Sequence, residues 1–219
     1  TMSKEYFIAL KRTDKYEEKK QIFLKTRVFK TINSLIKTFF DKNLESHQFL
    51  LDLGSSDNSL VKVAQNYGMK AKGLDIVDLD LEKDKINLPD DSCDVVTAIS
   101  LIEHIHKPEN FLKEVKRVLK STGYFIIVTP DWSSNMKFFY DDPTHLRPYS
   151  KKSLKFLLEL SGFKNINVVP WLVCKPTWMW KIPLKFFFAR LIPFRGDTYD
   201  WVPNILKGRS KTLLSICTK

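Results

Sequence analysis

The chain has 219 residues, of which 43% are hydrophobic and 28% are charged, as in an ordinary folded protein. This length suits one α/β domain with a substantial core and excludes two full domains. Its three cysteines have no CxxC spacing, so we predict neither a structural zinc, nor any other metal site, nor a disulfide framework. Without a signal-like start or an apolar stretch of about 18 residues, the sequence favours a cytoplasmic protein that does not span a membrane.

The formal net charge is +11, and the excess lies at the two ends of the chain. Residues 1–46 carry 11 basic and 6 acidic side chains, residues 47–169 carry 16 and 17, and residues 170–219 carry 9 and 2. A basic periphery around a near-neutral centre favours an anionic substrate, an anionic partner or contact with a membrane surface. A basic surface that serves only solubility is the alternative.

From Lys15 to Phe40, apolar residues recur close to the helical period, which predicts one or two amphipathic helices ahead of the sheet. Beyond Phe49, strand and helix patterns alternate, which predicts a parallel sheet covered on both faces. The predicted strands are 49–53, 71–76, 94–99 and 123–129, with a brief one at 78–81, and the predicted helices are 59–67 and 108–119.

The remainder of the chain adds one helix and two strands. Ser150 caps a predicted helix that ends before Gly162, and residues 165–169 and 211–217 have strand-like patterns. We predict a single domain with an N-terminal helical lid, a cofactor-binding core, an aromatic and basic insertion over one side of the sheet, and a final strand. The boundaries of these four parts are 1–46, 47–169, 170–210 and 211–219.

The end of the first predicted strand is the most informative segment. Phe49–Leu53 is followed by the small residues Gly54, Ser55 and Ser56, and the acidic Asp75 lies 21 positions after Gly54. This layout is typical of a nucleotide-type cofactor site, because a glycine turn lets the backbone approach the ligand at a helix N-terminus. A nicotinamide dehydrogenase is disfavoured, since the glycines of Gly-x-Gly-x-x-Gly are missing after the first.

Several segments, in the expected order, resemble the class I S-adenosylmethionine-dependent methyltransferases, in particular their small-molecule branch. They are Leu51–Gly54, Gly73–Asp75, Leu88–Val96, Ile102–Ile105 with Pro108–Leu112, and Leu119–Tyr124. The resemblance implies a Rossmann-like α/β sandwich of three layers, whose mostly parallel, seven-stranded sheet has a C-terminal antiparallel strand. It also implies the cofactor S-adenosyl-L-methionine, with S-adenosyl-L-homocysteine as the product.

The resemblance places the cofactor at the ends of the first strands. Asp52 would bind the ammonium group, Asp75 the ribose hydroxyls and Asp80 the adenine, while Arg27 is a candidate for the cofactor carboxylate. For each, a structural or solvent-exposed role is the alternative. The full expected set is Asp52, Gly54, Ser55, Ser56, Asp75, Ile76, Asp80, Leu81 and Ser100.

Methyl transfer from a sulfonium is an in-line displacement, and a hydroxyl acceptor additionally needs a base with a near-neutral pKa. His145 is the main candidate for this base, with Asp142 or Asp141 orienting it and Arg147 binding an acceptor carboxylate or phosphate. Their segment resembles one found in methyltransferases of bacterial glycan and lipid-linked pathways. The alternative is a rigid loop that only closes onto the core. His104 suits a structural or substrate-shaping role.

We therefore predict a cytoplasmic methyltransferase that methylates an oxygen atom of a small-molecule acceptor or of a sugar- or lipid-linked one. The acceptor carries an anionic group in one form of this prediction, and the protein contacts a membrane surface peripherally in another. Residues 170–210 would cap the acceptor pocket, dock at an anionic bilayer or form a dimer contact. An RNA methyltransferase is favoured by charge but lacks a recognisable RNA-binding module, so nucleic acid is the weaker partner. A non-catalytic, cofactor-binding partner subunit is a further alternative. The sequence indicates neither the acceptor nor the oligomeric state.

Overall fold

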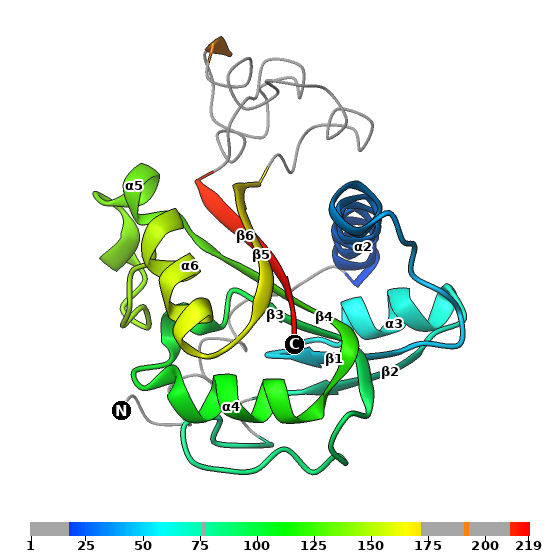
Figure 1. Ribbon diagram of the computed structural model, residues 1–219. Coiled ribbons are helices and arrows are strands. Elements are labelled where there is room, and N and C mark those ends of the chain that lie inside the picture. Colours follow the sequence, from blue (N-terminus) through cyan, green and yellow to red (C-terminus); the bar gives the residue numbers. More distant parts are fainter. Residues whose placement is uncertain (1–17, 76–77, 172–190, 193–210) are drawn as a thin grey trace.

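The protein is described by a computed structural model that covers residues 18–75, 78–171, 191–192 and 211–219. A twisted sheet forms the middle layer (Figure 1). Helices α2 (Glu18–Phe40) and α3 (Ser59–Asn66) cover one face, and α4 (Pro108–Val118) and α6 (Lys151–Leu160) cover the other. The predicted three-layer, Rossmann-like α/β sandwich is confirmed.

The described sheet has the strand order β2-β1-β3-β4-β6-β5. Its first four strands are parallel, whereas β6 pairs antiparallel with both β4 and β5, as predicted for the C-terminal strand. The chain reverses its direction of travel across the sheet between β1 and β3, and ligands of open α/β sheets bind at such a switch point. The strands are β1 (Phe49–Leu53), β2 (Lys70–Leu74), β3 (Cys93–Ile99), β4 (Leu119–Pro130), β5 (Lys164–Pro170) and β6 (Thr212–Thr218).

The sheet has six strands in the described part of the chain, so the prediction of a seventh at residues 78–81 was wrong. Aspartate side chains there accept hydrogen bonds from nearby backbone N–H groups, so these groups do not bond to a neighbouring strand. The Asp78 carboxylate accepts from Asp75 N at 2.8 Å, and the Asp80 carboxylate accepts from Glu82 N at 3.0 Å. Such local bonds favour turns over strands.

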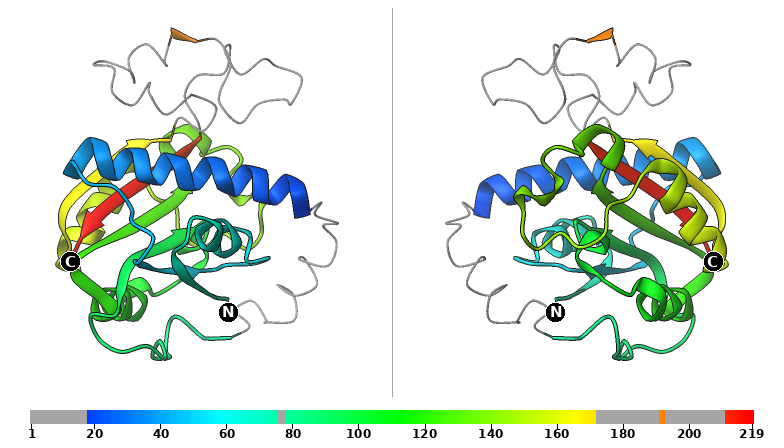
Figure 2. Two further views of the ribbon diagram at one scale, coloured as in Figure 1. Left: turned by 90° about the vertical axis from the view of Figure 1, so that its right-hand side faces the viewer. Right: turned by 90° about the vertical axis from the view of Figure 1, so that its left-hand side faces the viewer.

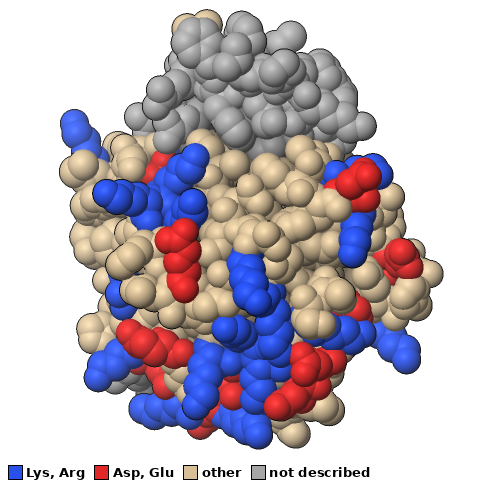
Figure 3. Space-filling model, viewed as in Figure 1, with Lys and Arg blue, Asp and Glu red and all other residues tan. Residues whose placement is uncertain are grey.

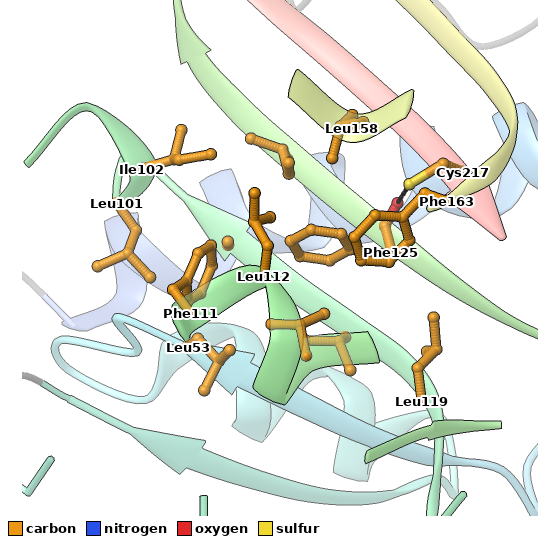
Figure 4. Packing of buried hydrophobic residues seen from close by; sticks show 14 of the residues in the cluster. Leu53, Leu101, Ile102, Phe111, Leu112, Leu119, Phe125, Leu158, Phe163 and Cys217 are labelled. Carbon is orange, nitrogen blue, oxygen red and sulfur yellow. Dashed lines mark hydrogen bonds between the residues drawn. The ribbon is translucent and has the colours of Figure 1, made fainter. Parts of the chain in front are cut away.

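The hydrophobic core consists of two clusters, one on each face of the sheet. Figure 4 shows Phe111 and Leu112 of α4 packed with Phe125 of β4 and Phe163 at the start of β5. On the opposite face, four fully or almost fully buried side chains of α2 pack with α3 and the sheet: Phe29, Ile32, Leu35 and Ile36. Each face of the sheet therefore excludes water, which is what parallel strands require.

The helix predicted ahead of the sheet is the single helix α2, which crosses the molecule above α3 and the strands (Figure 2). Because one face of this helix is buried from Val28 to Ile36, this part of the predicted lid is a component of the core. Residues 1–17 of that lid, and nearly all of the aromatic insertion at 172–210, lie outside the described residues. No helix in the described ranges combines the length and apolar character needed to cross a bilayer.

Arg117 at the end of α4 binds the connection between β2 and β3, residues 75–92. Its guanidinium donates to the carbonyls of Ile86 at 2.7 Å and Leu88 at 2.9 Å, and it pairs with Glu114 at 2.8 Å and Asp90 at 2.6 Å. The hydrogen bonds from Arg117 lower the pKa of the Glu114 carboxyl, although burial opposes this. Since Arg117 binds both the loop and a nearly buried carboxylate, it supports this whole segment.

We expect Arg117→Gln to lower the free energy of unfolding by about 3–5 kcal/mol, because Glu114 would be left as an unpaired buried charge. Lys113→Gln, on an exposed position of the same helix, should change it by less than about 0.5 kcal/mol. Urea unfolding of the two variants and the wild type measures both effects. Equal stability of all three proteins would show that the network does not hold the loop.

Candidate active site

The C-terminal ends of β1, β2 and β3 meet at one edge of the sheet. Leu53 is paired with Leu74 of β2 on one side and with Ala98 of β3 on the other. The residues that directly follow β1, β2 and β3, namely Gly54, Asp75 and Ser100, therefore emerge at the same edge. The structure thus brings three of the predicted cofactor-binding positions together at the switch point.

The turn after β1 depends on two glycines. Gly54 has a φ of +73°, and a Cβ atom there would lie 3.1 Å from Leu101 Cδ1. Gly73 of β2 has no room for a side chain, since its Cβ would lie 2.6 Å from Ser55 Oγ, with Asn58 Oδ1 closer still. The absence of side chains at both positions lets the turn fold tightly over the end of β2 and expose its backbone at the edge of the sheet.

The turn also uses two left-handed residues other than glycine. Ser56, where many family members have a second glycine, has a φ of +51°, and Asn58 at the start of α3 has a φ of +58°. Such conformations cost free energy and are concentrated at functional sites. The serine therefore adopts the left-handed conformation that a glycine would adopt more easily, and cofactor binding by this turn stays a prediction.

Asp52 is a buried carboxylate directly before this turn. Its side chain is 3% exposed and accepts a hydrogen bond from Thr97 Oγ1 at 2.6 Å. Burial raises its pKa from 3.8 to about 6; the Thr97 bond and the charge of Lys25 oppose the rise, while Asp57 and Asp75 add to it. Lys25 of α2 lies two residues before Arg27 and is a cation whose charge acts on Asp52, while binding of the cofactor carboxylate by Arg27 stays a prediction. Three carboxylates around one point favour a cationic ligand group.

The residues predicted to bind the adenosine part of the cofactor are only partly described by the structure. Asp75 follows β2 directly, whereas Ile76 lies outside the described residues. The Asp80 carboxylate binds within its own turn and pairs with Lys83 at 3.1 Å. That turn is tied to the start of α4, where Asn110 donates to the Leu81 carbonyl at 3.3 Å. Binding of adenine by Asp80 and Leu81 stays a prediction.

The predicted catalytic residues lie in the loop between η2 (Phe139–Asp141) and α6. His145 Nδ1 lies 2.6 Å from the Phe139 carbonyl oxygen, so this nitrogen carries the proton and Nε2 carries the lone pair. The Phe139 carbonyl therefore orients the ring through Nδ1. Asp142 Oδ2 lies 3.8 Å from Nε2, where its charge favours any cation bound by that nitrogen, and its predicted role in orienting His145 stays a prediction. Arg147 donates to the His106 carbonyl at 3.3 Å.

Sequence reasoning missed Glu103, a residue of η1 (Ile102–His104). Its side chain is fully buried, Oε2 accepts from Thr129 Oγ1 of β4 at 3.0 Å, and Oε1 has no hydrogen-bond partner within the described residues. Burial raises the pKa of this carboxyl from 4.5 to about 7, although its backbone and Thr129 oppose the rise. A charged residue inside the apolar run from Ile99 to Ile105 is the sequence signal that could have identified it.

His104 also has a more defined place than the sequence suggested. Its Nδ1 lies 3.0 Å from the Thr144 carbonyl and 2.8 Å from Thr144 Oγ1, and its ring centroid lies 4.9 Å from that of His145. The Thr144 hydroxyl in turn donates to Asp142 at 2.6 Å. Asp142 therefore holds Thr144, and Thr144 holds His104. Burial lowers the pKa of His104, which favours the neutral ring.

The cofactor turn and this histidine cluster are neighbours. Leu101, whose side chain packs against Gly54, lies two residues before Glu103 in the same short segment after β3. The Gly54 turn and the residues Glu103 and His104 therefore lie on the same side of the sheet edge. The edge of the sheet combines a site for a cationic ligand with a group of proton- or metal-binding side chains.

A sequence model of the family described as "Methyltransferase domain" matches residues 24–168, which is most of the described core. The chain belongs to the class I S-adenosylmethionine-dependent methyltransferases. The family assignment agrees with the fold, with the position of the glycine turn and with the acidic residue after β2.

Curated relatives match over a shorter stretch. A Mycolicibacterium smegmatis protein named "Probable S-adenosylmethionine-dependent methyltransferase" is 35% identical over 82 residues, which cover 36% of this chain and 32% of the relative. A Mycobacterium tuberculosis protein with the same description is 32% identical over 84 residues, or 31% of its length. The chain thus spans about a third of the length of the curated relatives it matches.

Solved structures of methyltransferases share the fold at low sequence identity. A SAM-dependent methyltransferase from Archaeoglobus fulgidus has a TM-score of 0.60 and 18% identity, covering 86% of this chain and 93% of that chain. Phosphoethanolamine N-methyltransferase 2 from Haemonchus contortus, solved with phosphomonomethylethanolamine and S-adenosylhomocysteine, has a TM-score of 0.55 and 16% identity. The match covers 87% of this chain and 52% of that chain.

The methyltransferase's own residues fit the cofactor of its family. S-adenosylmethionine carries an ammonium, a sulfonium and an adenosine with two ribose hydroxyls. The buried Asp52 carboxylate suits the ammonium group, because its hydrogen bonds to the described residues come from one hydroxyl, that of Thr97. Asp75, directly after β2, suits the ribose hydroxyls. A tight turn without side chains at Gly54 and Gly73 leaves space for close approach to the backbone.

We expect Asp52→Asn to stabilise the protein without cofactor but to weaken cofactor binding. Because the pKa of Asp52 rises on folding, the folded wild type holds more protons between pH 4 and 6, and its stability falls as pH rises through this window. The variant should lack this fall and gain up to about 3 kcal/mol at pH 7, since one pKa unit corresponds to about 1.4 kcal/mol.

The same substitution should weaken S-adenosylhomocysteine binding at least about tenfold, measured by calorimetric titration, because the ammonium group loses its carboxylate. Glu45→Gln, at an exposed position remote from the turn, is the matched control and should change neither quantity. Unchanged cofactor affinity in Asp52→Asn would contradict the assignment of this carboxylate.

Proposed function

We propose that the chain transfers a methyl group from S-adenosylmethionine to an oxygen atom of a small-molecule, sugar-linked or lipid-linked acceptor. When bound, the cofactor supplies an electrophilic methyl group on a positively charged sulfur. The protein then has to bind the acceptor hydroxyl in line with that methyl group and to promote loss of the hydroxyl proton. A cytoplasmic location, with contact at a membrane surface, belongs to the same proposal.

One observation carries this proposal: His145 is held with its Nε2 lone pair inside the site. The Phe139 carbonyl fixes the protonated nitrogen, and the ring also stacks against Phe139 with centroids 4.6 Å apart. The Asp142 carboxylate, 3.8 Å from Nε2, favours a positive charge there. In the simplest form of the mechanism, His145 accepts the hydroxyl proton. Methylation of an amine would need no such base once the amine is neutral.

The acceptor side of the loop is apolar and basic. Four large apolar side chains in residues 136–146 are 42–59% exposed, namely Met136, Phe138, Tyr140 and Leu146. Lys211 Nζ lies 4.9 Å from the ring centroid of Phe138, and Arg147 is nearby in sequence. Apolar surface next to cations suits an acceptor with a hydrophobic part and an anionic group. This composition supports the lipid-linked form of the proposal.

The charge distribution weakens the RNA alternative in the described part of the chain. Figure 3 shows Lys and Arg side chains gathered with acidic ones on the side of α4. Several basic side chains of the described residues are paired with acidic ones: Lys120 pairs with Asp94 at 2.8 Å and Lys219 with Asp91 at 2.6 Å. These pairs lie at the N-terminal ends of β3 and β4, opposite the candidate site. Phosphates bound there would not hold a nucleotide at the methyl group.

We expect His145→Gln to lower kcat/KM at least about a hundredfold on a hydroxyl acceptor found by screening for S-adenosylhomocysteine release, because loss of general base catalysis costs factors of this size. Cofactor affinity should stay within about twofold, which shows that the variant is folded. His47→Gln, an exposed histidine on the opposite side of β1, should behave as the wild type. Full activity of His145→Gln would exclude His145 from the reaction.

A further inference from the structure

The group formed by Glu103, His104 and His145 has the composition of a metal centre. One ligand atom from each, a carboxylate oxygen and two imidazole nitrogens, lies within 4.8 Å of the other two. A tetrahedral ion with bonds of about 2.1 Å would space its donors about 3.4 Å apart. Modest side-chain rotation is therefore enough to close the group around one ion.

Both histidines are oriented as metal ligands usually are. In each ring, Nδ1 lies within 3.0 Å of a backbone carbonyl, that of Thr144 for His104 and that of Phe139 for His145. A carbonyl can only accept, so Nδ1 carries the proton and Nε2 carries the lone pair. Metal-bound histidines characteristically donate their second ring N–H to a carbonyl or a carboxylate, which fixes the tautomer and the ring orientation.

A second and independent observation is the unpartnered carboxylate oxygen. Glu103 is 0% exposed, and its Oε1 atom has no hydrogen-bond partner in the described part of the chain, while Oε2 accepts from Thr129. A buried polar atom without a partner is costly, and a cation bound to it removes that cost. The atom without a partner belongs to the one carboxylate in the group. A cation bound to this atom would explain why a glutamate is present inside a mostly apolar segment.

We propose that Glu103, His104 and His145 bind one divalent first-row transition-metal ion, such as Zn²⁺ or Mn²⁺, on the acceptor side of the cofactor. Two imidazoles disfavour Mg²⁺ and Ca²⁺, which prefer oxygen ligands. Three protein ligands leave at least one position open, as in catalytic metal sites. The inference rests on the proposed function and refines it: the ion would take the place of the proton at His145 Nε2, and the acceptor hydroxyl would be its remaining ligand. The Asp142 carboxylate, 3.8 Å from Nε2, would then accept the hydroxyl proton while the cofactor leaves as the neutral thioether.

The arrangement around the group is consistent with this role. Asp142 lies outside the three ligands but holds Thr144 through Oδ1, and its Oδ2 adds negative charge 3.8 Å from His145 Nε2. Its charge would favour a divalent ion, and Oδ2 would lie beside an acceptor hydroxyl bound to that ion. Asp142 therefore positions His104 through Thr144 with one oxygen and would serve as the base with the other.

Metal binding is tested on the purified, untagged full chain after treatment with a chelator and dialysis. Calorimetric titration with Zn²⁺ alone, and electron paramagnetic resonance with Mn²⁺ alone, should show one site per chain with tighter binding than for Mg²⁺. Glu103→Gln and His104→Gln should each weaken Zn²⁺ binding at least about tenfold. His106→Gln, an exposed histidine two residues further along, is the matched control and should bind as the wild type.

The outcomes separate this inference from the proposed function. Unchanged Zn²⁺ and Mn²⁺ binding in a His104→Gln/His145→Gln double variant, or no binding by the wild type, would overturn the metal site. Cofactor binding by each variant, measured separately with S-adenosylhomocysteine, shows that it is folded. Methyl transfer that persists in the chelated protein would leave the proposed function intact and the metal inference refuted. One-site binding that depends on these residues, without methyl transfer to any hydroxyl acceptor, would support the site and contradict the function.

Discussion

Glu103 joins the strand ends to the loop that carries His145. Its backbone carbonyl accepts hydrogen bonds from Leu146 N at 2.9 Å and Arg147 N at 3.0 Å, while its carboxylate accepts from Thr129 of β4 at 3.0 Å. One residue therefore fixes the distance between β3, β4 and the loop from Phe139 to Tyr149. Because the same segment packs Leu101 against Gly54, the position of the histidine cluster relative to the cofactor turn is set by the sheet itself. Sites built on rigid elements in this way keep their geometry better than sites on loops alone.

The sheet edge is organised around two buried carboxylates that have few partners among the described residues. Asp52 and Glu103 are both buried, and each has a single described hydroxyl partner, Thr97 for the first and Thr129 for the second. Asp52 lies in β1, and Glu103 lies in η1, which follows the neighbouring strand β3. A ligand with a positive group at Asp52 and a cation or proton at Glu103 would complete both. The polarity of this edge therefore suits a positively charged cofactor such as S-adenosylmethionine.

Much of the fold could be predicted from the sequence because the central strands and helices obey strong periodic patterns. The strand at 49–53 was predicted with the bounds that it has, and the helices at 59–67 and 108–119 were correct to one residue. The prediction failed at Asp78–Leu81, where carboxylates bond to their own backbone and override an alternating pattern. Side-chain competition of this kind depends on local geometry that periodicity does not record.

The candidate site was predictable only in part, and for a similar reason. Asp52 just before the glycine turn and Asp75 at a fixed spacing after it could be found from the sequence, since parallel strands bring their ends together regardless of the intervening chain. The partners of His145 could not be predicted from spacing, because the ring is oriented by the Phe139 carbonyl, a backbone atom that carries no residue-specific signal. Glu103 was overlooked because a single acidic residue in a helix-like segment is usually exposed, whereas here a short 3₁₀ turn points it at β4.

The buried carboxylates also explain how binding and stability are coupled in this fold. A group that is buried with too few partners destabilises the folded chain, and any ligand that supplies the missing partner binds only the folded state. Ligand binding then also removes the unfavourable free energy of the unpartnered buried group. The folded protein is therefore more stable with the ligand bound than without it. Core packing on both faces of the sheet has to compensate, and the fully buried side chains of α2 and α4 supply it. A helix that the sequence suggested as a lid is, in its C-terminal half, part of the packing that allows the site to hold such charges.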